Sequence, residues 1–177
     1  MNIRSGVRGL VKSRGFLQAV WVVLGMAFLT ASSLPAKAYD REDQRPLSEV
    51  YSIIEDFVRE KYLSNWSSSP RLIRRRYADP MDYYWGKKNV PMKQVLRDKL
   101  RYMSRWPQRY FRLVEDTLEV TRSEDDPYLY AVKFRYEFET KRRGEQRAGI
   151  GQTGLLLEVL GRRILIRGEG GKVLERY

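Results

Sequence analysis

The chain has 177 residues, of which 34 are lysine or arginine and 22 are aspartate or glutamate, so its net charge is +12 at pH 7. It contains no cysteine and no histidine. These absences exclude disulfides, thiolate nucleophiles, the common zinc sites and every catalytic triad with an imidazole base. Any catalytic proton transfer would have to use aspartate, glutamate, tyrosine, lysine or arginine with a shifted pKa.

The first 38 residues have the layout of a signal peptide. Basic residues without any acid precede a short apolar run over residues 16–29, and small residues follow up to Ala38. The run is shorter than the roughly 20 residues that cross a bilayer. We therefore expect cleavage before Tyr39 rather than an uncleaved membrane anchor, and the predicted location is periplasmic, with no membrane span in the mature chain.

The mature chain is predicted to hold a single domain. Residues 39–45 are expected to be a flexible lead-in, and residues 46–177 suffice for one core but not for two. Without the export segment the chain keeps 29 basic and 22 acidic residues. This moderate excess favours anionic partners, but nucleic acid is not expected in this compartment.

Three helical segments are predicted from apolar residues that recur at steps of three and four, namely residues 46–62, 71–77 and 91–105. In the third, Lys99 is placed largely outside the apolar stripe. Between the second and third segments, the Asp79–Pro80 pair interrupts helical structure. Residues 81–85 are predicted to be extended.

Beyond residue 109 the apolar period changes to two, which predicts antiparallel strands. The first, over residues 110–120, needs a bulge near Glu115 and Asp116, because its apolar residues change phase there. The next strands cover residues 130–139 and 146–160. A shorter stretch from residue 164 leads to a glycine-rich turn around Glu169 and a last short strand. The predicted fold is α+β: a cone-shaped curved antiparallel sheet of about four strands packed on three N-terminal helices.

Four segments of the sequence resemble bacterial domains of the nuclear transport factor 2-like superfamily, in particular a secreted alphaproteobacterial single-domain group. These are residues 77–86, 95–99, 105–109 and 168–174. The resemblance implies a helix-covered curved sheet over residues 46–177, a tendency to pair through the sheet, and either a binding role or chemistry inside the cone. Enzymes of this superfamily typically place an Asp–His pair or a Tyr and Asp there, and the histidine is missing from this chain.

Aromatic and acidic residues are the candidates for a site at the concave face. The predicted ligand-binding residues are Tyr77, Asp82, Tyr84, Trp106 and Tyr136. If the protein is an enzyme, the acid–base candidates are Asp79, Asp82, Tyr83 and Tyr84, since burial can raise a carboxyl pKa towards neutrality. The alternative is that the tyrosines fill the core and the two aspartates cap turns.

A basic cluster at a predicted hairpin tip is the third candidate site. Arg142, Arg143 and Arg147 form a patch that suits an anionic partner, although protection of a sheet edge explains such charges equally well. No metal site and no cofactor are predicted.

The sequence thus favours a non-catalytic periplasmic binding or accessory module that engages a partner protein or a cell-envelope component. A homodimer is plausible through the exposed sheet face that carries Lys133, Arg135, Glu137 and Glu139. The alternative function is a histidine-free small-molecule isomerase or cyclase-like enzyme with an Asp/Tyr site in the cone.

Overall fold

The computed structural model describes residues 45–64 and 69–177. The predicted signal peptide, residues 1–38, and nearly all of the predicted lead-in lie outside these residues. Within the described part of the chain, no helix is long and apolar enough to cross a membrane.

The helical segments lie close to where the apolar stripes predict them. They are α1 (Leu47–Asp56), which continues into the π-helical turn η2 (Phe57–Tyr62), α2 (Pro70–Arg76) and α3 (Met92–Arg105). Each begins just after or at a proline, whose fixed φ suits a first helical turn. One prediction about α3 was wrong: the Lys99 side chain is only 20% exposed and lies on the inward side.

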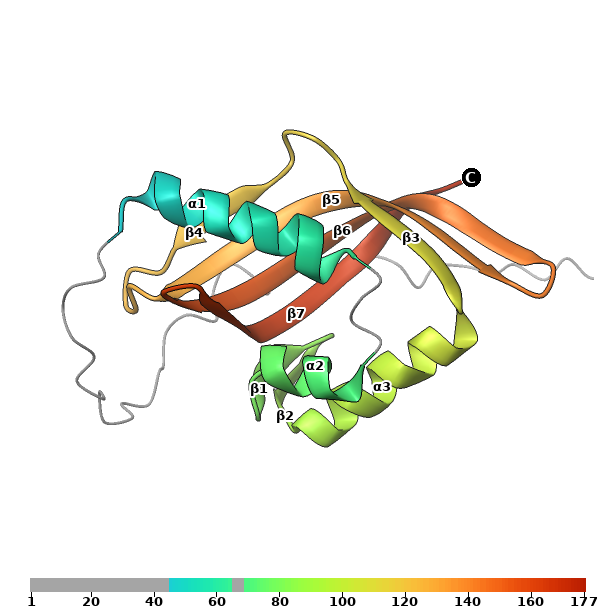
Figure 1. The fold of residues 1–177 in the computed structure, drawn as a ribbon, viewed down its shortest axis with the longest axis horizontal. Helices are drawn as coiled ribbons and strands as arrows, with labels where there is room; N and C mark the ends of the chain where they lie inside the picture. Colours follow the sequence, from blue (N-terminus) through green and yellow to red (C-terminus); the bar gives the residue numbers. More distant parts are fainter. Residues whose placement is uncertain (1–44, 65–68) are drawn as a thin grey trace, which may run out of the picture. The chain divides into compact units, whose positions relative to one another are not determined.

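All strands of the described domain belong to one mixed β-sheet. Its strands are β1 (Met81–Tyr84), β2 (Lys87–Val90), β3 (Gln108–Leu113), β4 (Glu119–Arg122), β5 (Leu129–Arg142), β6 (Glu145–Leu160) and β7 (Arg163–Arg176). The order is β2-β1-β7-β6-β5-β3, and β4 also pairs with β5. All neighbours are antiparallel except β1 and β7. Figure 1 shows the long strands β5, β6 and β7 curving beneath α1, with α2 and α3 near the β1–β2 hairpin.

The prediction of about four strands was wrong, since the sheet formed by residues 81–176 has seven strands. Residues 81–90 form a hairpin whose turn residues Trp85 and Gly86 both have positive φ, as tight hairpin turns require. Residues 110–120 form two strands, because the chain turns at Asp116, also at positive φ. The glycines around Glu169 do not interrupt β7, which runs without a break through residues 163–176.

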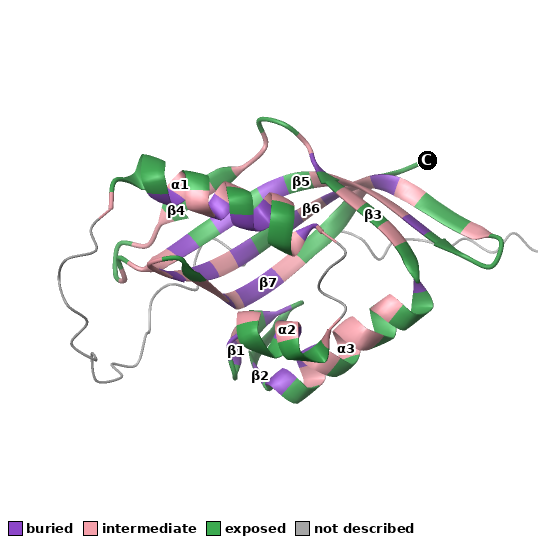
Figure 2. Cartoon of the chain, viewed as in Figure 1, coloured by how far each residue is buried: buried purple, intermediate pink, exposed green. Residues whose placement is uncertain are grey.

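The core lies between the helices and the concave face of the sheet. Along β5, buried Tyr130, Val132 and Phe134 alternate with exposed residues, as the period of two predicts. Figure 2 shows the same alternation along the long strands, and the buried side of α1 facing them. Gly151 makes room on this face, since a Cβ there would lie 2.5 Å from Cζ of Tyr136.

Candidate functional site

A single acidic side chain is buried among the described residues, and it lies in the middle of β7. Glu169 is 2% exposed. In the sheet it is registered with Tyr84 of β1 on one side and Leu155 of β6 on the other. Side chains at registered positions point to the same face of a sheet, so Glu169 projects from the concave face towards the helices.

Two donors from different helical segments hold one oxygen of this carboxylate. The Lys99 ammonium of α3 lies 2.5 Å from Oε1 of Glu169, and the Tyr62 hydroxyl donates to the same oxygen at 3.1 Å. The π-helical turn η2 ends at Tyr62, and such turns often occur at functional positions. The Lys99 ammonium also lies 5.2 Å from the ring centre of Tyr77. Glu169, Lys99, Tyr62 and Tyr77 are hereafter called the polar centre.

The second carboxylate oxygen of Glu169 accepts no such hydrogen bond from the described residues. Oε2 of Glu169 is buried and has no hydrogen-bond partner among the described residues. Buried polar atoms are nearly always paired, because an unpaired one loses its hydration without compensation. The polar centre therefore contains one strong acceptor that is not satisfied by the described residues.

Burial and the nearby carboxylate keep the surrounding tyrosines protonated. Desolvation, followed by the charge of Glu169, raises the pKa of Tyr62 and of Tyr77 well above 10.0. The same two causes raise the pKa of Tyr84. These hydroxyls therefore act as hydrogen-bond donors at neutral pH, not as bases.

The two aspartates that the sequence offers as acid–base candidates both have partners within the chain. Oδ1 of Asp79 accepts the backbone N–H of Met92 at 3.0 Å, at the first residue of α3. Asp82 forms two hydrogen bonds with Arg167 of β7, at 2.9 and 3.0 Å. Neither carboxylate belongs to the polar centre.

The predicted aromatic residues are divided between two places. Tyr77 belongs to the polar centre, and the charge of Glu169 also acts on Tyr84 and Tyr136. Tyr136 packs in a row of rings with Phe111 and Phe134. Trp106 is buried elsewhere, beneath the guanidinium groups of the β5–β6 hairpin. Tyr83 is 36% exposed and covers Gly170.

The basic hairpin tip is partly engaged by the protein itself. Arg142 and Arg147 both pair with Glu145, at 2.7 and 2.6 Å. Both also stack over the ring of Trp106. Arg143 is exposed at the turn. Two of the three arginines in the predicted patch therefore have intramolecular partners.

Sequence reasoning missed two members of the polar centre. The glycines around Glu169 predict a turn there, and the apolar stripe of residues 91–105 places Lys99 largely outside it. A signal was available for Lys99, because it follows the buried Val95 by four residues and so lies on the same side of the helix. For Glu169, only the pairing of β7 with both β1 and β6 shows that the residue is interior.

Two of the cavities on the described part of the chain border α2 and β1, and neither is lined by Glu169. The larger, of about 640 Å³, is bounded by residues of α2, the segment after it and the start of β7. The smaller, of about 220 Å³, is lined by Tyr84, Trp85, Lys87, Gln94 and Asp98. Tyr84 thus lines the smaller cavity, and the charge of Glu169 acts on the same tyrosine.

Comparison with known proteins identifies the fold. A nuclear transport factor 2-like superfamily protein from Salmonella enterica serovar Typhimurium matches with a TM-score of 0.59 and 14% identity, covering 72% of this chain and 93% of that one. The described domain has the nuclear transport factor 2-like fold. The family resemblance seen in the sequence is thus confirmed at the level of fold, whereas membership of a secreted alphaproteobacterial group stays a prediction.

Other solved structures with this fold carry different descriptions. One is a putative calcium/calmodulin dependent protein kinase II association domain from Xanthomonas campestris, with a TM-score of 0.54, 13% identity, and 81% and 93% of the two chains covered. Another is a putative scytalone dehydratase from Novosphingobium aromaticivorans, with a TM-score of 0.54, 6% identity, and 74% and 85% covered. No family model and no curated protein match the sequence. The fold thus admits both binding modules and enzymes.

Proposed function

We propose that this protein is a non-catalytic binding module of the periplasm, which engages a partner protein or a cell-envelope component through its surface. The supporting observation is that the acidic candidates on the concave side have intramolecular partners. Oε1 of Glu169 is held by Lys99 and Tyr62, while Asp79 and Asp82 bind a helix amide and an arginine. An acid–base enzyme needs such a group free of structural partners in an open site. Of these three carboxylates only Asp79 lines a cavity, and it accepts the Met92 amide there.

Pairing through the exposed sheet face remains part of this proposal. The charges on that face form pairs within the chain, since Lys133 binds Glu119 and Arg112 binds Glu137. Pairs of this kind are exposed and weak, so they can be exchanged for pairs with a second copy. The description of the Xanthomonas campestris structure as an association domain is compatible with this idea. Sedimentation equilibrium of residues 39–177 tests it directly.

The experiment that tests the binding function is a capture from the periplasmic extract of the host. Tagged protein comprising residues 39–177 is the bait, and bound material is identified by mass spectrometry. A stoichiometric partner is expected. Recovery of the bait alone from both the soluble and the envelope fractions would overturn the proposal. N-terminal sequencing of protein from the same fraction tests the predicted cleavage before Tyr39.

One observation favours a second candidate function, a histidine-free isomerase or cyclase-like enzyme. Oε2 of Glu169 is an unpaired carboxylate oxygen among protonated tyrosines, and such an oxygen is a chemically competent proton acceptor. Under this hypothesis Glu169→Gln abolishes turnover of a substrate retained in native mass spectrometry. Under the binding hypothesis no turnover is found, and capture of the partner survives the substitution.

A further inference from the structure

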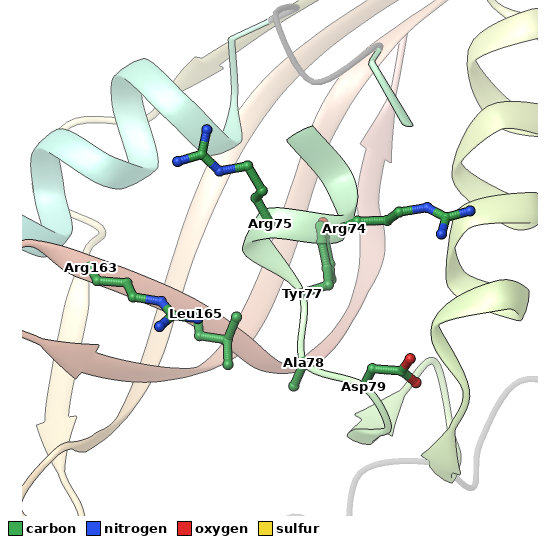
Figure 3. A pocket seen from close by; sticks show the side chains of 7 residues that line it. All are labelled: Arg74, Arg75, Tyr77, Ala78, Asp79, Arg163 and Leu165. Atoms are coloured by element: carbon green, nitrogen blue, oxygen red, sulfur yellow. The ribbon is translucent and has the colours of Figure 1, made fainter. Parts of the chain in front are cut away.

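The larger cavity is a groove whose lining combines cations with an apolar floor. Its seven lining residues, hereafter called the arginine groove, are Arg74, Arg75, Tyr77, Ala78, Asp79, Arg163 and Leu165. Its volume of about 640 Å³ lies within the usual range of ligand sites. Figure 3 shows that the Arg74 side chain extends towards α3 while the Arg75 side chain extends to the opposite side. The cations are therefore spread around the groove rather than gathered at one point.

All three arginines are available for an external partner. Arg74, Arg75 and Arg163 are exposed, and no described residue forms an ion pair with any of them. This contrasts with Arg142 and Arg147 of the hairpin tip, which share Glu145. The only acid in the lining, Asp79, accepts the Met92 N–H and points away from Arg163 in Figure 3. The groove is therefore suited to several separate negative charges.

A short stretch of open sheet edge lies beside these cations. Ile166 accepts the backbone N–H of Ala78, so the peptide groups of Ile166 point away from β6. The peptide N–H and C=O of Ile164, two residues earlier, also point away from β6. Its partner in β6, Val159, donates its own N–H to Tyr128 instead of to β7. No backbone group among residues 45–64 or 69–177 pairs with this side of β7 before Ile166.

The open strand edge, the apolar part of the lining and the dispersed cations together favour one class of partner, an extended peptide. An extended peptide adds to a free strand edge through its own backbone, and its alternate side chains then point to the same side. Arg163 and Leu165 are two residues apart in β7 and so lie on the same side of the strand. The guanidinium groups pair with carboxylates of the peptide, and Tyr77, Ala78 and Leu165 supply the apolar part of the lining. A lipid headgroup or a polysaccharide would use the cations but has no peptide N–H for the edge.

We propose that the arginine groove binds an extended acidic peptide segment of a partner protein, which adds to the edge of β7 at Ile164. This inference rests on the proposed binding function and names the kind of partner and the surface. It assigns the carboxylates of the peptide to Arg75 and Arg163, on the side of the groove away from Asp79. Arg74 contacts the part of the peptide nearest α3.

Fluorescence anisotropy with defined peptides tests the proposal. The probe is a labelled ten-residue peptide of alternating glutamate and valine, and its glutamine–valine counterpart controls for charge. The protein variants are Arg75→Gln/Arg163→Gln and, as a matched control, Arg101→Gln/Arg176→Gln, which removes two exposed arginines outside the groove. A third probe, methylated at alternate backbone nitrogens, removes the hydrogen bonds to the edge without altering the protein.

The expected result is binding of the acidic probe that weakens about tenfold in the groove variant, since two charge pairs are lost. The control variant should bind as the unaltered protein does. Methylation of the probe should weaken binding by a similar factor. Equal affinities of the two variants, or insensitivity to methylation, would overturn the proposal. So would stronger binding to phosphatidylglycerol vesicles, with the same arginine dependence, than to the peptide.

The capture experiment separates this proposal from the function on which it rests. If Arg75→Gln/Arg163→Gln still captures the partner from the extract, the groove assignment is wrong while the binding function stands. If no form of the protein captures a partner, the binding function itself fails. Circular dichroism of each variant ensures that a lost interaction is not a lost fold.

Discussion

The strongest test of the polar centre is the replacement of Lys99 by methionine. Methionine keeps the length and the apolar stem of lysine but removes the ammonium that lies 2.5 Å from Oε1 of Glu169. The carboxylate stays 2% exposed, and its remaining donor is the Tyr62 hydroxyl. A buried charge is thereby left without its counter-ion.

The size of the effect follows from the burial of the two partners. Removing one member of a buried ion pair typically costs about 3–5 kcal/mol. The side chain of Lys99 is 20% exposed, so water enters more easily and the lower end, about 3 kcal/mol, is expected. For a domain of this size that corresponds to a melting temperature lowered by roughly 10 °C.

Urea unfolding followed by circular dichroism measures this cost. Lys93→Met is the matched control, because Lys93 lies in the same helix and is exposed; it should change the free energy of unfolding by less than about 0.5 kcal/mol. The double variant Lys99→Met/Glu169→Gln removes both charges and should recover part of the loss. The reasoning is refuted if Lys99→Met costs no more than Lys93→Met, or if the double variant is less stable than Lys99→Met alone.

Three further predictions concern the tyrosines, Asp82 and a glycine of β6. The pKa values of Tyr62 and Tyr77 are raised in the folded state, so the unfolded chain loses these protons at lower pH than the folded protein does. The protonated tyrosines therefore stabilise the fold fully below pH 10, and this stabilisation is lost as the pH rises beyond 10. Urea midpoints measured between pH 8 and 11 should therefore fall, and less steeply in Tyr62→Phe. Asp82→Asn should cost only about 0.5–1 kcal/mol in urea unfolding, since the Arg167–Asp82 pair is partly exposed; a lost enzymatic turnover with unchanged stability would instead support a catalytic Asp82. Gly151→Ala should lower the free energy of unfolding by about 1–3 kcal/mol, because the new Cβ would clash with the Tyr136 ring. Gly154→Ala is the control and should be close to neutral, since there is open space around Gly154. Equal melting temperatures of the two variants would contradict this packing argument.

Local sequence patterns predicted the parts of the fold that depend on neighbours in the chain. The apolar stripes located α1, α2 and α3, since a helix buries residues three and four positions apart. The alternation through Tyr130, Val132 and Phe134 identified the buried face of β5. Where the pattern was short, prediction failed: β1 and β2 have four residues each, which is too few for a period of two to be distinctive.

In the candidate site, too, local sequence patterns identified some residues, while others are brought together only by the tertiary structure. Tyr77 and Tyr84 could be selected as aromatic residues in a motif, but Asp82 from the same motif is bound to Arg167, which is 85 residues away. Glu169 and Lys99 meet across 70 residues, and Tyr62 reaches Glu169 across 107. No spacing rule connects residues so far apart, because their proximity depends on how β7 inserts between β1 and β6.

The sequence by itself determined the chemical repertoire and the positions of the helices and the long strands. Without cysteine or histidine, acid–base chemistry is confined to carboxylates, tyrosines, lysines and arginines, and the periods of the apolar residues separate a helical first half from a stranded second half. Only the tertiary structure decided which charges are used internally and which stay available. Burial in a shared interior pairs Lys99 with Glu169, because an isolated charge there would be too costly, while Arg75 and Arg163 remain at the surface beside an open strand edge.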